Sequence, residues 1–89
     1  MGYQSADTMT SKGLIYSGMN MNELASGFWF RYSGEYNIEN KPPYESFIVI
    51  VYNTASYKIQ IAYNVANIKE SVRRAFFADV WGAWEKQLS

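Results

Sequence analysis

The sequence contains neither cysteine nor histidine, and these two absences exclude much of the chemistry that proteins perform. Without cysteine there is no disulfide and no thiolate nucleophile. Without histidine the chain lacks the commonest general base and the commonest metal ligand. We therefore expect no metal site, no cofactor and no catalytic residue, and we interpret the protein as not being an enzyme.

An excess of charge of one sign is also lacking. Eight basic and eight acidic residues give a formal net charge of zero, so no surplus of positive charge is present to bind nucleic acid or an anionic membrane. The aromatic stretch 27–32 is similar to the base-stacking strand of RNA-recognition sheets, but the two helices of such folds are not predicted. No run approaches the roughly 18 apolar residues of a transmembrane helix. We expect neither a nucleic-acid partner nor membrane insertion.

The eight acidic residues are scattered, with no paired spacing. A carboxylate pair of the kind that cleaves glycosidic bonds could form only through folding, for example from Glu35 and Glu45. Asp79 is interpreted as a turn residue. Arg73 and Arg74 are neighbours in a predicted strand and point to opposite faces, so they form no basic patch. This distribution also favours a non-enzymatic protein.

What the chain does have is apolar and aromatic surface. Of its 89 residues, 48% are hydrophobic and 18% are aromatic, including eight tyrosines. A single domain of this size buries roughly 60–65% of its unfolded surface, so it is marginally stable alone. Tyrosine-rich surfaces are common in interfaces and ligand sites. We expect one folded domain that gains stability by assembling with other chains.

The chain divides into two predicted parts. Residues 1–13 are polar and small, which predicts a flexible or extended lead-in and is typical of the end of a longer chain. Residues 14–89 are predicted to form the folded β domain. Near its start, Asn20 or Asn22 is expected to cap a single helical turn that ends before Gly27.

Short strands dominate the domain. The run 47–52 is the most apolar, and its lack of alternation indicates that both of its faces are covered. The run 57–63 alternates large apolar residues with polar or small ones, which predicts a half-exposed strand paired with it. Together with strands near 28–32, 72–77 and 81–87, this predicts a mainly β fold (β-rich α+β). We expect a small antiparallel meander or compact sandwich of five to six short strands, with at most one or two short helical turns.

Two sets of residues are candidates for interactions. The predicted core or subunit interface consists of Trp29, Phe47, Val49, Val51, Trp81 and Trp84. The second face of the 47–52 strand could be covered by other strands or by identical subunits. In a regular strand Trp81 and Trp84 face opposite sides, so they form one sugar-stacking platform only if the strand is bulged. In the long loop, Tyr36, Asn40 and Tyr44 suit hydroxylated ligands as well as turn formation, and are the candidate ligand-binding residues.

Several short motifs occur in an order and spacing typical of one family. They are Asn20-Met21-Asn22-Glu23-Leu24, Gly27-Phe28-Trp29-Phe30, Asn40-Lys41-Pro42, the strand 47–52, Gln60-Ile61-Ala62-Tyr63, Arg74-Ala75-Phe76, and Trp81-Gly82-Ala83-Trp84 with Leu88. Over residues 20–88 the chain resembles the pyocin-knob-type modules of phage tail fibres and receptor-binding proteins.

The resemblance implies a module of a homotrimeric fibre that helps a phage or phage-derived bacteriocin to reach or recognise a bacterial surface. The implied partners are further copies of the chain, with a trimer favoured, and a bacterial surface polysaccharide or another receptor. The implied location is the virion tail, without a signal peptide and released by host lysis. Two alternatives stay open: a purely structural trimerising spacer, and a carbohydrate-binding appendage of a cell-wall enzyme.

Overall fold

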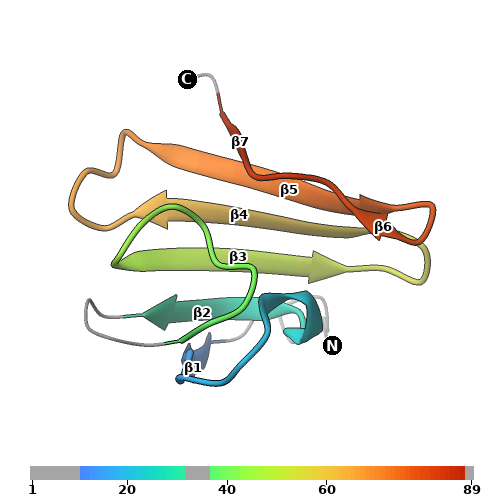
Figure 1. Ribbon diagram of the computed structural model, residues 1–89, viewed down its shortest axis with the longest axis horizontal. Coiled ribbons are helices and arrows are strands. Elements are labelled where there is room, and N and C mark those ends of the chain that lie inside the picture. Colours follow the sequence, from blue (N-terminus) through green and yellow to red (C-terminus); the bar gives the residue numbers. More distant parts are fainter. Residues whose placement is uncertain (1–10, 32–36, 88–89) are drawn as a thin grey trace, which may run out of the picture.

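The computed structural model describes residues 11–31 and 37–87. Within them, seven strands form one sheet, accompanied by one turn of 3-10 helix (Figure 1). The elements are β1 (Ser11–Leu14), η2 (Met21–Glu23), β2 (Gly27–Arg31), β3 (Phe47–Asn53), β4 (Lys58–Asn64), β5 (Ser71–Phe77), β6 (Val80–Trp81) and β7 (Glu85–Lys86). The prediction of a mainly β fold is confirmed.

Strands β2 to β5 form the expected antiparallel meander, but the ends of the sheet differ from expectation. β1 pairs with β2 in parallel, because the twelve residues from Ile15 to Ser26 form a crossover long enough to return the chain in the same direction. β1 also begins at Ser11, inside the lead-in predicted for residues 1–13. The described residues form a single sheet, so the sandwich alternative does not hold for one chain.

The last predicted strand is broken. β6 and β7 both pair with β5, at opposite ends of it, and the chain between them leaves the sheet at Gly82. This break, together with β1, raises the number of strands from the predicted five or six to seven. The reversal between β5 and β6 uses Ala78 and Asp79, both with left-handed backbone (φ 56° and 65°), as two-residue hairpins require.

The helical turn η2 has the expected cap. The Asn20 side chain accepts a hydrogen bond from the Asn22 backbone N–H at 2.9 Å. A backbone bridge between Asn20 and Glu39 then fastens the loop before β3 to η2, with Met21 N donating to Glu39 O at 3.1 Å. Two segments distant in sequence are thereby held together over the sheet.

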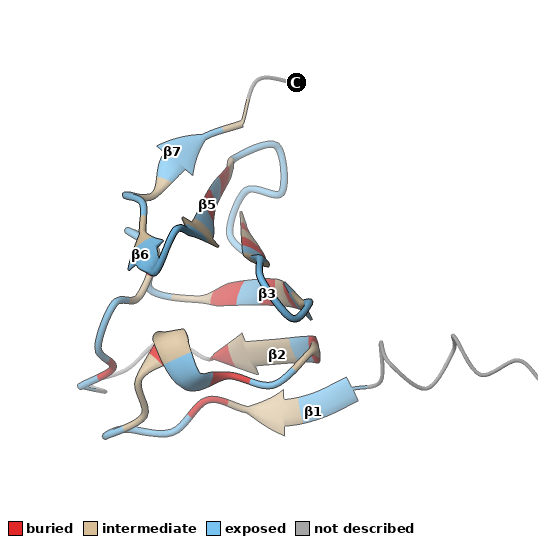
Figure 2. Ribbon diagram, turned by 90° about the vertical axis from the view of Figure 1, so that its right-hand side faces the viewer, coloured by how far each residue is buried: buried red, intermediate tan, exposed pale blue. Residues whose placement is uncertain are grey.

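One face of the sheet is covered, and we call it the covered face. The turn η2 and the strands β6 and β7 lie on this side, to the left in Figure 2. The hydrophobic core lies between these segments and the sheet, and consists of Ile15, Met21, Leu24, Ile38, Phe47, Val49, Val51, Ala62 and Val72. Strand register places Val49 between Trp29 and Ala62, so one apolar row crosses the middle of this face.

Candidate functional site

The predicted ligand-binding residues do not form one cluster among the described residues. Tyr36 lies outside the part of the chain that the structure describes. Asn40 has a left-handed backbone (φ 62°), and its side-chain Nδ2 donates to Asn20 Oδ1 at 2.8 Å. Its backbone oxygen accepts a hydrogen bond from Trp84 Nε1 at 3.1 Å. The polar groups of Asn40 therefore connect the loop to η2 and to the end of the chain.

Tyr44 is half-buried, packs against the core and lines an open hollow of about 510 Å³. The hollow is also lined by Pro43, Glu45, Ser46, Asn64, Ala66 and Glu70. Burial, and to a lesser degree the charge of Glu70, raises the pKa of the Tyr44 phenol. The Asn64 amide donates to Glu70 Oε1 at 2.8 Å. The hollow thus offers a phenol, an amide and two carboxylates, all of which hydrogen-bond hydroxyl groups.

The six residues predicted for the core or a subunit interface all belong to the covered side. Phe47, Val49 and Val51 have no exposed surface. Trp29 and Trp84 are partly buried and pack against the core. Trp81 is half-buried, and its ring packs against the Phe76 ring with centroids 5.5 Å apart.

A polar chain crosses the covered face beside these tryptophans. Gln60 is 1% exposed, and its Nε2 donates to the backbone oxygen of Met21. Its Oε1 accepts a hydrogen bond from Arg74 Nε at 2.9 Å. The Arg74 guanidinium also lies over the Trp81 ring, and burial lowers its pKa to about 10. These contacts connect η2, β4 and β5 with Trp81 in β6, and they stabilise the fold.

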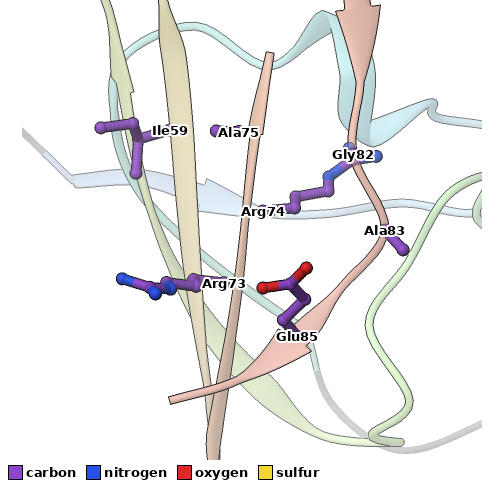
Figure 3. A pocket seen from close by; sticks show the side chains of 7 residues that line it. All are labelled: Ile59, Arg73, Arg74, Ala75, Gly82, Ala83 and Glu85. Carbon is purple, nitrogen blue, oxygen red and sulfur yellow. The ribbon is translucent and has the colours of Figure 1, made fainter. Parts of the chain in front are cut away.

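A hollow of about 340 Å³ opens where the chain leaves the sheet after β6. Figure 3 shows its lining, in which Arg73 and Arg74 leave β5 on opposite sides and Arg74 extends toward Gly82. Glu85 stands opposite Arg73 in the register of β5 and β7. The lining supplies a single carboxylate, Glu85, and in Figure 3 the Arg73 side chain extends away from it.

The other face of the sheet carries large apolar side chains, six of which are exposed; we call it the open face. It consists of Phe28, Phe30, Ile48, Ile50, Tyr52, Tyr57, Ile59, Ile61, Tyr63 and Phe77. Six of these are exposed, by 38% at Phe28 to 58% at Phe77, and the other four are half-buried. Tyr57 and Phe77 stack with ring centroids 5.2 Å apart at one end of the face.

The described residues contain no group of three or more His, Cys, Asp or Glu side chains able to hold a metal ion. No helix among them has the length and apolar character needed to cross a membrane. Two surfaces of the described residues offer groups for contact with other molecules, the open face and the hollow beside Tyr44.

Together the fold and these surfaces define a small single-sheet β module with one covered and one open apolar face. No protein-family model and no curated protein matches the chain. Among solved structures, the chain is similar to a C-terminal fragment of the R1 pyocin fibre of P. aeruginosa, with a TM-score of 0.78 and 22% sequence identity. The match covers 98% of this chain and 24% of that fragment. The predicted resemblance to pyocin-fibre modules is confirmed at the level of the fold.

Sequence reasoning did not identify the open face as a surface. The signal was present in two strands. The run 47–52 is apolar on both faces, and in the run 57–63 the large apolar residues alternate with Lys58, Gln60 and Ala62. The structure buries Gln60 and Ala62 and leaves Ile59 exposed, so the more apolar side of β4 faces outward.

Proposed function

We propose that this chain is a non-enzymatic module of a phage tail fibre or baseplate protein, which helps the assembled fibre to attach to a bacterial surface. The observation that carries the proposal is the structural match to the R1 pyocin fibre fragment over 98% of the chain. The order of the short motifs over residues 20–88 supports the same proposal. The virion tail is the proposed location, and several copies of the chain, with three favoured, are the proposed assembly.

The proposed receptor is a bacterial surface polysaccharide. Tyr44 supports this choice because it lines a hollow with the Asn64 amide and the Glu45 and Glu70 carboxylates, and sugars are recognised by such groups beside an aromatic ring. Asn40 and Tyr36 complete the proposed contact set. In Asn40, one Nδ2 hydrogen is donated to Asn20, and the side-chain oxygen and the second Nδ2 hydrogen are left for a ligand.

The test is adsorption of the fluorescently labelled chain to a panel of bacterial strains, followed by a glycan array. We expect Tyr36→Ala, Asn40→Gly and Tyr44→Ala to reduce adsorption, with Tyr44→Ala having the largest effect. Tyr16→Ala is the matched control, since Tyr16 is 61% exposed and does not line the Tyr44 hollow. Unchanged adsorption by all three variants would remove the site assignment, and no adsorption by the parent chain to any strain would remove the attachment role.

A purely structural spacer is the second candidate. The internal hydrogen bonds of Asn40 to Asn20 and Trp84 favour it, because they give this loop residue a role in stability without a ligand. The glycan array separates the two candidates. A spacer assembles normally and binds no glycan.

A further inference from the structure

We infer that the open face is the surface through which copies of this chain associate, each copy packing this face against the same face of a neighbour. The inference deepens the assembly part of the proposed function and rests on it. It names a surface opposite to the six residues that the sequence suggested for an interface. Its support is the pattern, the area and the charge of the face.

The side chains of the open face lie in rows across the sheet. Strand register aligns Phe30 with Ile48 and Tyr63 in one row, and Phe28 with Ile50 and Ile61 in the next. Tyr52 and Ile59 form a third row. Cross-strand apolar rows of this kind normally pack against a second layer. Among the described residues, that layer is present only on the covered face (Figure 2).

Strand β4 shows that the outward position of these residues is not incidental. In a sheet with one solvated face, the apolar set of an alternating strand turns inward. Here Ile59 is 42% exposed whereas Gln60 is 1% exposed. Turning the larger apolar set outward is favourable only if something apolar covers it, because burial of apolar surface is the main stabilising term in folding and association.

The area is large enough for a specific contact. Six side chains that are about half exposed, each with on the order of 200 Å² of surface, present roughly 600 Å². Half-buried Ile50, Ile61 and Tyr63 add to it. A monomer rarely exposes a larger apolar patch than this. The total approaches the ~800 Å² that each partner contributes to an interface of standard size.

Charge favours a copy of this chain as the occupant. Among the residues of these rows and their β5 neighbours, Arg73 is the one charged residue, paired in register with Ile61 at the border of the face. A face with one charge at its border repels a second copy of itself little, and it offers few ion pairs with which to select a differently charged protein. Identical apolar faces of two or three copies can pack against one another about a shared symmetry axis.

The first test is molar mass by light scattering over a dilution series of the full chain. We expect the parent chain to be multimeric at high concentration. Tyr52→Lys or Ile59→Lys places a charge in the contact and should weaken association by roughly 100-fold or more. Glu23→Lys is the control and should leave association unchanged, because Glu23 is exposed on η2, which lies on the covered side. A monomeric parent chain, or lysine variants that associate like the parent, would overturn the inference.

A second measurement does not require the fold to tolerate a lysine on the open face. The chain has no cysteine, so Ile59→Cys and Glu23→Cys each introduce one thiol. We expect the maleimide labelling rate of Ile59→Cys to fall at least about tenfold between dilute and concentrated protein, and that of Glu23→Cys to stay constant. A concentration-independent rate for Ile59→Cys contradicts the inference. Association through this face without adsorption to cells would sustain the inference while removing the attachment role, and adsorption by a monomer would do the reverse.

Discussion

The Arg74 guanidinium carbon lies 4.1 Å from the centre of the Trp81 ring, and 4.9 Å from that of Trp84. Both indoles reach the same cation because the chain leaves the sheet between β6 and β7, so the strand rule that places residues three apart on opposite faces does not apply there. Arg74 Nη2 is buried without a hydrogen-bond partner among the described residues. The aromatic rings therefore compensate part of the cost of burying this charge.

Removing Arg74 is expected to destabilise the fold. Arg74→Ala deletes the hydrogen bond to Gln60 Oε1 and the contact with both indoles, and leaves a buried amide oxygen unpaired. We expect a loss of about 3 kcal/mol in the free energy of unfolding, measured by urea titration. Arg73→Ala on the exposed side of β5 is the control, with an expected change below about 0.5 kcal/mol. Equal losses in the free energy of unfolding for the two substitutions would show that the contacts of Arg74 do not stabilise the fold.

Neighbouring residues of β3 are expected to respond differently. Val49 is fully buried and Ile48 is 45% exposed on the open face. In dilute protein, Val49→Ala should lower the free energy of unfolding by about 2 kcal/mol, whereas Ile48→Ala should lower it by less than about 1 kcal/mol. Thermal unfolding at several protein concentrations tests this. A growing effect of Ile48→Ala with concentration is the signature of a covered open face, and a large effect at every dilution contradicts it.

Asn40 combines a backbone requirement with a side-chain link. Its φ of 62° is unfavourable for alanine and accessible to glycine, and its Nδ2 bonds to Asn20. Asn40→Ala should therefore destabilise the protein by about 2 kcal/mol, and Asn40→Gly by about 1 kcal/mol. Calorimetric unfolding of the two variants separates the contribution of the backbone conformation from that of the side-chain hydrogen bond. An identical loss in both would mean that the left-handed backbone contributes nothing.

Stability is expected to be flat near neutral pH and to change in alkali. The chain has no histidine, the side chain that ordinarily titrates between about pH 5 and 8. Burial and Glu70 raise the pKa of Tyr44, so its neutral form is favoured in the folded state. The corresponding stability is present below the ordinary tyrosine pKa and is lost as pH rises through the higher folded pKa. Tyr44→Phe should remove this alkaline loss in urea titrations at successive pH values.

Arg74 acts with the opposite sign in the same alkaline range. Burial lowers its pKa to about 10, so above that pH the folded chain releases the proton before the unfolded chain does. The unfolded state then binds more protons, and the free energy of unfolding rises with pH. Arg74→Met should abolish this rise. A decline in stability between about pH 6 and 9 would contradict the expected flat profile near neutral pH, and an alkaline rise that persists in Arg74→Met would contradict the assignment to Arg74.

Much of the fold could be predicted from short-range signals. The β-branched run 47–52, the Asn20 cap and the turn at Asp79 are set by local backbone and side-chain preferences, and each appears as expected. The parallel pairing of β1 could not be predicted in this way, because it depends on where a twelve-residue crossover places the chain. The broken last strand likewise results from the contact of Trp81 and Trp84 with Arg74, which lies outside their own segment.

The interaction surfaces were harder to predict for a different reason. Hydrophobicity indicates which residues avoid water, but not whether the same chain or another one covers them. Ile59 and Val51 are both apolar strand residues, yet one is 42% exposed and the other fully buried. Asn40 shows the converse difficulty, since an amide in a loop suits a ligand and an internal link equally, and the structure shows the link to Asn20.

The parallel pairing of β1 with β2 has a mechanical consequence. The backbone hydrogen bonds that join the two strands lie across the strand axis. A pull on Ser11 along that axis therefore loads these bonds together, in shear, whereas a pull away from the sheet opens them one after another. A force applied along β1 would therefore have to be large to separate β1 from β2. A force applied sideways would detach β1 at a much lower value.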